Sequence, residues 1–344
     1  MPERIDYLPM QPTMPPSRRR FSATAQRDTA LALVTLSLFI GVTIAFPQFA
    51  QPTNLAEVLD DSALLILLAL GQMLVILSRG IDLSIAANLA LSGMIAALFN
   101  RSFPDVGIVA VMGIATVSGA ALGAINGLLV WKLKLPPIVV TLGTMSVYRG
   151  CIYLLSHGTW INDNELSRGF LSFVQVKFLG LTSLSWIAIV ASAFALAAMR
   201  HTNSGRNFYA AGDNPSAAAN VGIDAGRMQF IAYTLCGAIA GLCGYLWVAR
   251  FAVAYTDIAL GFELQVIAAC LIGGIAVAGG SGSVIGVLLG CLFIGVIRNA
   301  IPLVGISPFW QMLINGIVIV VAALLGARGR ERGRVILEPD RAAP

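Results

Sequence analysis

Charge-free apolar runs occupy most of this chain, and they constrain its fold more than any other feature. Asp, Glu, Lys and Arg are all absent from residues 29–56, 106–131, 228–249, 264–297 and 299–327. A helix needs about 20 apolar residues to cross the hydrocarbon core of a bilayer, so each run is long enough. Only 11% of the residues are charged, whereas about a quarter is usual in soluble domains. The pattern predicts an all-α polytopic membrane protein.

The runs divide into about ten expected transmembrane helices, which make up one transmembrane domain over residues 29–326. They are placed at residues 29–46, 56–78, 83–99, 106–130, 136–156, 183–199, 228–249, 262–278, 283–301 and 308–326. The Pro-rich segment 1–28 is expected to be a disordered basic tail. Residues 327–344 are expected to form a second basic tail.

Two ladders of glycine at intervals of four residues indicate close helix packing. One lies in the fourth expected helix and the other in the ninth: Gly119, Gly123 and Gly127, and Gly282, Gly286 and Gly290. Glycine lets two helix backbones approach closely in lipid. Because the two helices run in opposite directions, the ladders suggest an inverted repeat of helices 2–5 and 7–10, as in many transporters. Such ladders are also frequent in membrane helices, so a chance match is the alternative.

The distribution of Lys and Arg predicts the orientation. Most of the 22 basic residues fall in the two tails and in the loops on the same side, including residues 200–227. The positive-inside rule therefore places both termini and the 200–227 loop in the cytoplasm. Topology alone explains the pI of about 9.1, and no nucleic-acid partner is needed to account for it.

The loop 205–224 is the one substantial polar segment between long apolar runs. Asn214 and Pro215 have the chemistry of a helix N-cap and first helical position, and Gly222 that of a helix stop. We expect a short helix around Ser216–Asn220, on which a partner can push. The alternative is an ordinary solvated connector.

Enzymatic chemistry and ion-driven transport find little support in the residues. There is no G-x-x-x-x-G-K-[ST] phosphate loop, and the five cysteines and two histidines have no metal-site spacing, so no metal is expected. The ionisable residues of the apolar region stand near the helix ends: Asp60, Asp61, Asp82, Arg149, Glu263 and Arg298. Proton- or ion-coupled carriers usually hold such groups at mid-membrane, so we expect a partner to supply the energy.

Five motifs in a fixed order resemble the permease subunits of bacterial ABC importers for monosaccharides, the family serving ribose, xylose, arabinose and rhamnose. The likeness covers residues from about 55 to 326. The motifs are Gly80-Ile81-Asp82-Leu83-Ser84, residues 137–145 with Arg149-Gly150, residues 205–223, Ile272-Gly273-Gly274 with residues 279–282, and residues 307–311. Residues 244–250 and 261–264 look most like rhamnose-type members.

This resemblance implies a ten-helix permease in the bacterial inner membrane, paired with a second permease chain. It also implies a periplasmic sugar-binding protein and a cytoplasmic ATPase, which uses the ATP, so this chain binds no cofactor directly. In the family, the matching loop carries the helix that seats in the ATPase; the residues carried over are Gly205, Gly212, Asn214, Pro215, Ala217, Ala218 and Gly222. Ala219 stands where the family often has arginine, which puts one polar contact to the ATPase in doubt.

Six polar residues are candidates for the translocation path of L-rhamnose, or next of ribose or xylose. They are Asp82, Asn88, Asn126, Thr141, Thr144 and Glu263. Neutral amides and hydroxyls can hydrogen-bond a sugar without trapping it, but each can equally join two helices. Asp82 can alternatively cap the helix that follows. Two rival functions stay open: a proton-coupled secondary transporter, and an ABC permease for branched-chain amino acids or nucleosides.

Overall fold

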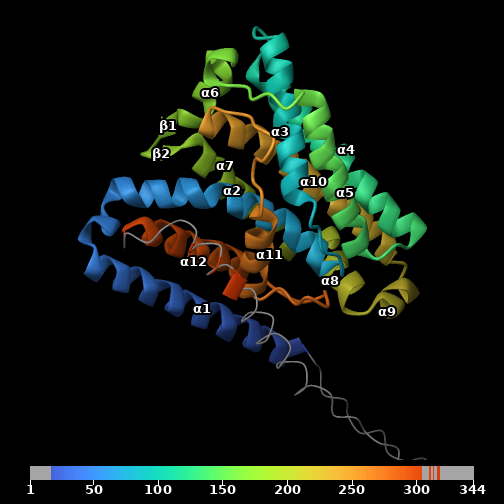
Figure 1. Ribbon diagram of the computed structural model, residues 1–344. Helices are drawn as coiled ribbons and strands as arrows, with labels where there is room; N and C mark the ends of the chain where they lie inside the picture. The colour runs from blue at the N-terminus through green and yellow to red at the C-terminus, as the bar shows by residue number, and fades with distance from the viewer. Residues whose placement is uncertain (1–16, 304–309, 311–312, 314–315, 318–344) are drawn as a thin grey trace, which may run out of the picture.

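The computed structural model describes residues 17–303, 310, 313, 316 and 317, which form an almost entirely helical bundle (Figure 1). The helices are α1 (Ser17–Ala45), α2 (Pro52–Leu77), α3 (Ile85–Ser102), α4 (Ile108–Leu133), α5 (Pro137–Ser156), α6 (Arg168–Gln175), α7 (Ser183–His201), α8 (Asn203–Asp213), α9 (Pro215–Asn220), α10 (Ala225–Phe251), α11 (Phe262–Ile272) and α12 (Val284–Leu303), with the 3-10 turns η1 (Pro47–Ala50) and η2 (Asp163–Glu165). Strands β1 (Lys177–Phe178) and β2 (Leu181–Thr182) form a short antiparallel hairpin that pairs Lys177 with Thr182.

Seven of the described helices are long and apolar enough to cross a bilayer, which confirms the all-α polytopic class. They are α1, α2, α4, α5, α7, α10 and α12. The tenth expected helix, at 308–326, lies outside the described residues except for positions 310, 313, 316 and 317, and the 327–344 tail lies outside them entirely.

Two helix boundaries differ most from expectation. Helix α1 begins at Ser17, so residues 17–28 are helical although the sequence suggested disorder; no proline follows Pro16 until Pro47, and Ala, Arg and Gln favour helix. Helix α11 has 11 residues and ends at Ile272 instead of 278, because Gly274 turns the chain with a φ of +90°. At about 1.5 Å per residue such a helix is too short to cross the membrane.

Helix α10 is the centre of the packing, and both glycine ladders lie at close helix contacts. A Cβ added to Gly119 would stand 2.3 Å from the Gly237 carbonyl oxygen of α10, and one added to Gly123 would stand 2.2 Å from that of Tyr233. On α12, Gly286 and Gly290 meet α11 in the same way. Gly282 lies in the turn before α12, not in the helix as expected.

The pairing of helices has the form that two inverted repeats would give. Helix α4 packs on α10, while α12 packs on α2, so the third helix of each expected repeat contacts the first helix of the other. In the same way α3 packs on α4, and α11 packs on α12. The repeat itself stays a prediction.

The two ends of the bundle carry different structures (Figure 1). At one end lie α8 and α9, which we call the α9 end. At the other lie α6 and the β1–β2 hairpin, which we call the hairpin end. Helix α8, α6 and the hairpin fall between the expected transmembrane helices.

Candidate functional site

Helix α9 occupies the position expected from the sequence and is capped at both ends. The Asn214 side chain accepts a hydrogen bond from the Ala217 amide at 3.1 Å, and Pro215 is the first helical residue. At the other end Gly222 has a φ of +82°, while the amides of Gly222 and Ile223 bond back to Ala219 and Ala218. These bonds form the glycine-terminated Schellman motif. A helix of six residues is thereby fixed without support from the membrane.

One face of α9 is free in this chain. Ala218 is buried against the protein at 4% exposure, whereas Ser216, Ala217, Ala219 and Asn220 are exposed. Val221, directly after the helix, is 74% exposed. The free face is therefore small-sided, uncharged and available to a partner.

Three chain segments meet through their backbones directly before α9, at what we call the three-way junction: Leu77–Arg79, Gly212–Asp213 and Gly279–Gly280. The Gly280 amide donates to the Leu77 carbonyl at 2.9 Å. A Cβ on Gly212 would stand 1.8 Å from the Leu77 carbonyl oxygen, and one on Gly280 would stand 2.3 Å from the Asp213 backbone. Glycine is therefore required at both positions, because no side chain fits there.

A buried polar network begins in the connection between α2 and α3. The Ser84 amide and hydroxyl both donate to one oxygen of Asp82, at 2.9 and 2.6 Å. The Asn126 amide group of α4 donates to the Ser84 hydroxyl at 2.7 Å, and Tyr148 of α5 donates to the Leu122 carbonyl of α4 at 2.8 Å. The network therefore joins the α2–α3 connection to α4 and α5.

Asp82 is not the N-cap of α3. The helix begins two residues later than expected, at Ile85, with Ser84 as the N-cap residue. Asp82 lies in the connection, outside the spanning helices, and its second carboxyl oxygen has no hydrogen-bond partner among the described residues. Burial raises the pKa of this carboxyl to about 6, while the two hydrogen bonds from Ser84 act in the opposite direction.

The structure brings some of the six path candidates together and separates others. Asp82 lies in the α2–α3 connection, and Asn126 and Thr141 bond to that connection. The Thr141 hydroxyl donates to the Ile81 carbonyl at 3.1 Å. Asn88 is buried nearby and donates to the Gly119 carbonyl of α4 at 3.0 Å. The Thr144 hydroxyl bonds within α5 itself, and Glu263 stands in the first turn of α11. Asn88 thus joins α3 to α4, whereas Asn126 and Thr141 join α4 and α5 to the α2–α3 connection.

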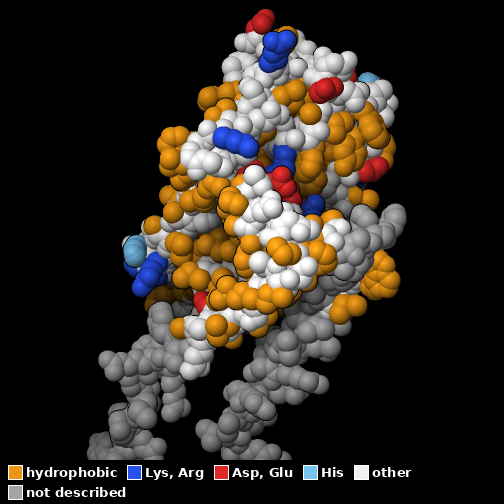
Figure 2. Space-filling view, turned by 90° about the vertical axis from the view of Figure 1, so that its left-hand side faces the viewer, with side chains coloured by type: hydrophobic (Ala, Val, Ile, Leu, Met, Phe, Trp, Pro, Cys, Tyr) orange, Lys and Arg blue, Asp and Glu red, His pale blue; other side chains and the backbone are white. Residues whose placement is uncertain are grey.

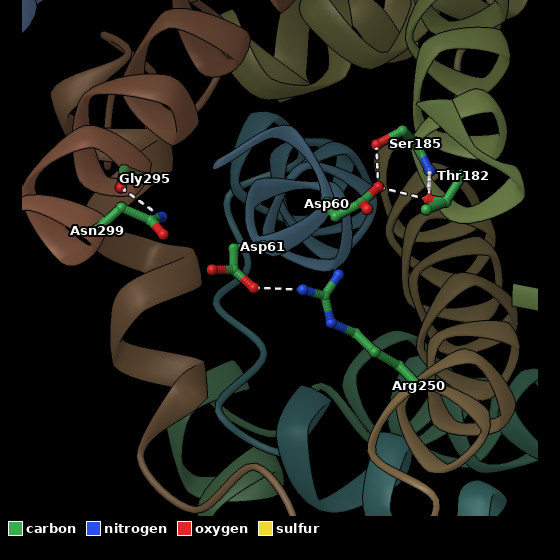
Figure 3. Close-up of polar contacts among 7 residues, drawn as sticks. All are labelled: Asp60, Asp61, Thr182, Ser185, Arg250, Gly295 and Asn299. Atoms are coloured by element: carbon green, nitrogen blue, oxygen red, sulfur yellow. Dashed lines mark hydrogen bonds and ion pairs between the residues drawn. The ribbon is translucent and has the colours of Figure 1, made fainter. Parts of the chain in front are cut away.

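The hairpin end is held by charged side chains (Figure 3). Asp61 of α2 pairs with Arg250 of α10. Asp60 accepts from the Thr182 hydroxyl and, at 2.5 Å, from that of Ser185. Figure 2 views the molecule from the left-hand side of Figure 1. It shows acidic and basic side chains gathered near the middle of that view, with apolar side chains around them.

Arg79 and Gly280 are the two residues of the three-way junction whose contacts sequence reasoning missed. Arg79 immediately precedes the Gly80-Ile81-Asp82-Leu83-Ser84 motif, and this adjacency was the one available signal. Gly279 and Gly280 stood out only as part of a family motif. Among the described residues, no group of three or more His, Cys, Asp or Glu side chains could hold a metal ion.

Comparisons with known proteins identify relatives over nearly the whole chain. The ribose import permease protein RbsC of Escherichia coli (strain K12) is 33% identical over 312 residues, which are 90% of this chain and 97% of that protein. The autoinducer 2 import system permease protein LsrC of Salmonella typhi is 34% identical over 313 residues, 90% of this chain and 88% of that protein. No solved structure matches. The family model described as branched-chain amino acid transport system / permease component matches residues 54–323, and the chain therefore belongs to that permease family.

Proposed function

We propose that this chain is the membrane-spanning permease subunit of an ATP-driven importer for a monosaccharide, in the bacterial inner membrane. The observation that carries the proposal is the similarity to import permeases along 90% of the chain, with 97% of the ribose permease aligned. Ribose is the sugar favoured by this relative. L-Rhamnose is favoured by the motif at residues 244–264, and xylose follows.

Energy enters at α9 in this proposal. The capped, rigid helix with an uncharged exposed face is suited to bind a cytoplasmic ATPase, which closes when it binds ATP. Closure displaces α8 and α9 and shifts the helix bundle between inward and outward access. A periplasmic sugar-binding protein delivers the sugar at the hairpin end, and a second permease chain completes the path.

Neutral polar groups favour a sugar as the transported molecule. Asn88, Asn126 and Thr141 are fully buried and bonded to other segments of the bundle, so their amides and hydroxyls become available only when these segments separate. Such groups hydrogen-bond sugar hydroxyls and give no fixed charge to hold an amino-acid carboxylate or ammonium group.

The experiment is sugar uptake in cells that lack their own uptake systems. This chain is expressed alone and with its cognate ATPase and binding protein, and ribose, L-rhamnose, xylose and leucine are compared. We expect uptake of one sugar by the full set only. Uptake of leucine would overturn the sugar assignment, and uptake by the chain alone that a protonophore abolishes would establish the secondary transporter instead.

A pair of variants tests the role of α9 in the same cells. Replacing Asn214, Pro215 and Ser216 by glycine removes the N-cap and the first turn, and we expect uptake to be lost. Replacing Pro104 and Asp105 by glycine changes an equally exposed connection between α3 and α4 and is expected to leave uptake intact. Equal uptake by both variants would contradict the role of α9.

A further inference from the structure

Arg79 adopts a backbone conformation that normally belongs to glycine. Helix α2 ends in a Schellman motif: the Arg79 amide bonds to the Ile76 carbonyl at 3.0 Å, and the Gly80 amide to the Val75 carbonyl at 2.8 Å. The residue after the C-cap of such a motif is left-handed and usually glycine. Gly222 fills this place after α9, but after α2 the place is taken by Arg79, with a φ of +67°.

A left-handed arginine is less favourable than glycine, and the Arg79 side chain makes contacts here that glycine cannot make. The guanidinium reaches to the last residues of α8. Its Nε donates to the Gly212 carbonyl at 2.6 Å and its Nη2 to the Asp213 carbonyl at 2.9 Å. These carbonyls are at the negative end of the α8 dipole, which makes a cation there favourable.

The same turn is bonded to the rest of the bundle on its other side. The Ser78 carbonyl accepts from Gln229 of α10 at 2.9 Å. The Ile81 carbonyl accepts from Thr141 of α5 at 3.1 Å and from Tyr233 of α10 at 3.3 Å. Through Asp82 and Ser84 the turn also reaches Asn126 of α4. Residues 78–84 therefore connect α8 with the three helices that hold the buried polar network.

We propose that Arg79 is the positioning residue that ties α8 and α9 to the bundle, so that displacement of α9 moves α4, α5 and α10 through residues 78–84. This inference rests on the proposed function. The guanidinium holds two carbonyls of α8 at once, and α9 begins two residues after the second of them. Without this hold, ATP hydrolysis continues but transports little sugar.

Three variants separate positioning from folding, each in the reconstituted complex with its ATPase and binding protein. Arg79→Gly removes the side chain and also relieves the left-handed backbone, so it is not expected to lower the melting temperature. Arg79→Lys keeps a cation that can reach one carbonyl. Lys134→Gly is the matched control: Lys134 is left-handed too, with a φ of +53°, and lines the same cavity of about 490 Å³ as Arg79. The structure gives the Lys134 side chain no hydrogen-bond partner among the described residues.

The decisive measurement is sugar transported per ATP hydrolysed in proteoliposomes. We expect Arg79→Gly to keep its ATPase rate while this ratio falls about tenfold or more, as loss of charge-assisted hydrogen bonds implies. Arg79→Lys should restore part of the ratio, and Lys134→Gly should match the wild type. An unchanged ratio in Arg79→Gly overturns the proposal, and so does a parallel loss of ATPase, uptake and melting temperature, which marks a purely structural residue.

Hydrogen exchange provides a readout that does not depend on the transported molecule. Amides of residues 205–222 should exchange faster in Arg79→Gly than in Lys134→Gly, because α8 loses its hold at the C-terminal end. Equal exchange overturns the inference. A wild-type complex that transports no sugar overturns the proposed function alone, since the exchange measurement still decides the role of Arg79.

Discussion

The two ends of the bundle are held together in different ways. At the α9 end every link of the three-way junction ends on a backbone carbonyl: the Gly280 amide donates to the Leu77 carbonyl, and the Arg79 side chain donates to two carbonyls of α8. At the hairpin end, links from side chain to side chain, as in Asp61 with Arg250 and Asp60 with Ser185, add to the backbone bridge between Ile161 and Ala254.

This difference assigns different mechanical roles to the two ends. The backbone contact of Gly280 with Leu77 has one geometry, because neither partner has rotamers there, and Gly212 leaves no space for even one added carbon atom. Side-chain ion pairs break and re-form by rotation about single bonds, and at partly exposed positions they contribute little to stability. In the proposed transport cycle the α9 end transmits a displacement as a rigid unit, and the hairpin end opens and closes.

The largest expected effect tests the rigidity of the three-way junction. In Gly212→Ala the new methyl group would stand 1.8 Å from the Leu77 carbonyl oxygen, so α8 must move away from α2. We expect a loss of about 3 kcal/mol or more, seen as little folded protein in detergent. Gly143→Ala on α5 is the control, since no atom lies within 4 Å of its added Cβ; a stable Gly212→Ala protein would show that the junction is loose.

Helix packing in the middle of the bundle should be the next most sensitive. Gly123→Ala places a methyl group 2.2 Å from the Tyr233 carbonyl oxygen, whereas Gly113→Ala on the same helix meets nothing within 4 Å. We expect the first to cost about 1–3 kcal/mol and the second to be neutral or slightly stabilising. Unfolding in mixed micelles measures the free energy of unfolding of both variants. Equal free energies would show that the glycine contact does not determine stability.

Local chemistry explains what the sequence revealed at the α9 end. The caps of α9 depend only on neighbours in the chain, since Asn214 bonds three residues ahead and Gly222 turns the helix end. The apolar runs predicted most of the helices because they too are a local feature of the sequence. Helix α8 was missed although its cap is local too: Thr202 accepts from the Gly205 amide at 3.0 Å, but two glycines made the segment resemble a loop.

Long-range contacts explain what the sequence could not reveal. Leu77 and Gly280 are neighbours only in the folded chain, so neither the junction nor the left-handed Arg79 follows from any local pattern. The path candidates were polar residues chosen by type, and their partners depend on which helices meet. Asn126 reaches Ser84 because α4 packs on α3, of which Ser84 is the N-cap residue. Glu263 lies in the first turn of α11, where the sequence placed it.

A smaller effect is expected from the main ion pair of the hairpin end. The side chains of Asp61 and Arg250 are 35% and 22% exposed, so their coupling should be about 0.2–1 kcal/mol. A double-mutant cycle of Asp61→Asn and Arg250→Gln, followed by unfolding in mixed micelles, isolates it. A coupling as large as the loss in Gly123→Ala would contradict an end that opens easily.

The smallest effect is expected where the hairpin end is most exposed. Arg101 and Glu165 pair at 3.2 Å with side chains that are 40% and 34% exposed, and added salt screens such a pair. Glu165 is also held without Arg101, because its second oxygen accepts from the Asn162 amide at 3.0 Å. Asn100 and Ser167 fix the same loop through bonds of 3.0 and 2.9 Å. Arg101→Gln should therefore leave the melting temperature unchanged at low and high salt, and a clear decrease at low salt alone would show that this exposed pair helps to hold the hairpin end closed.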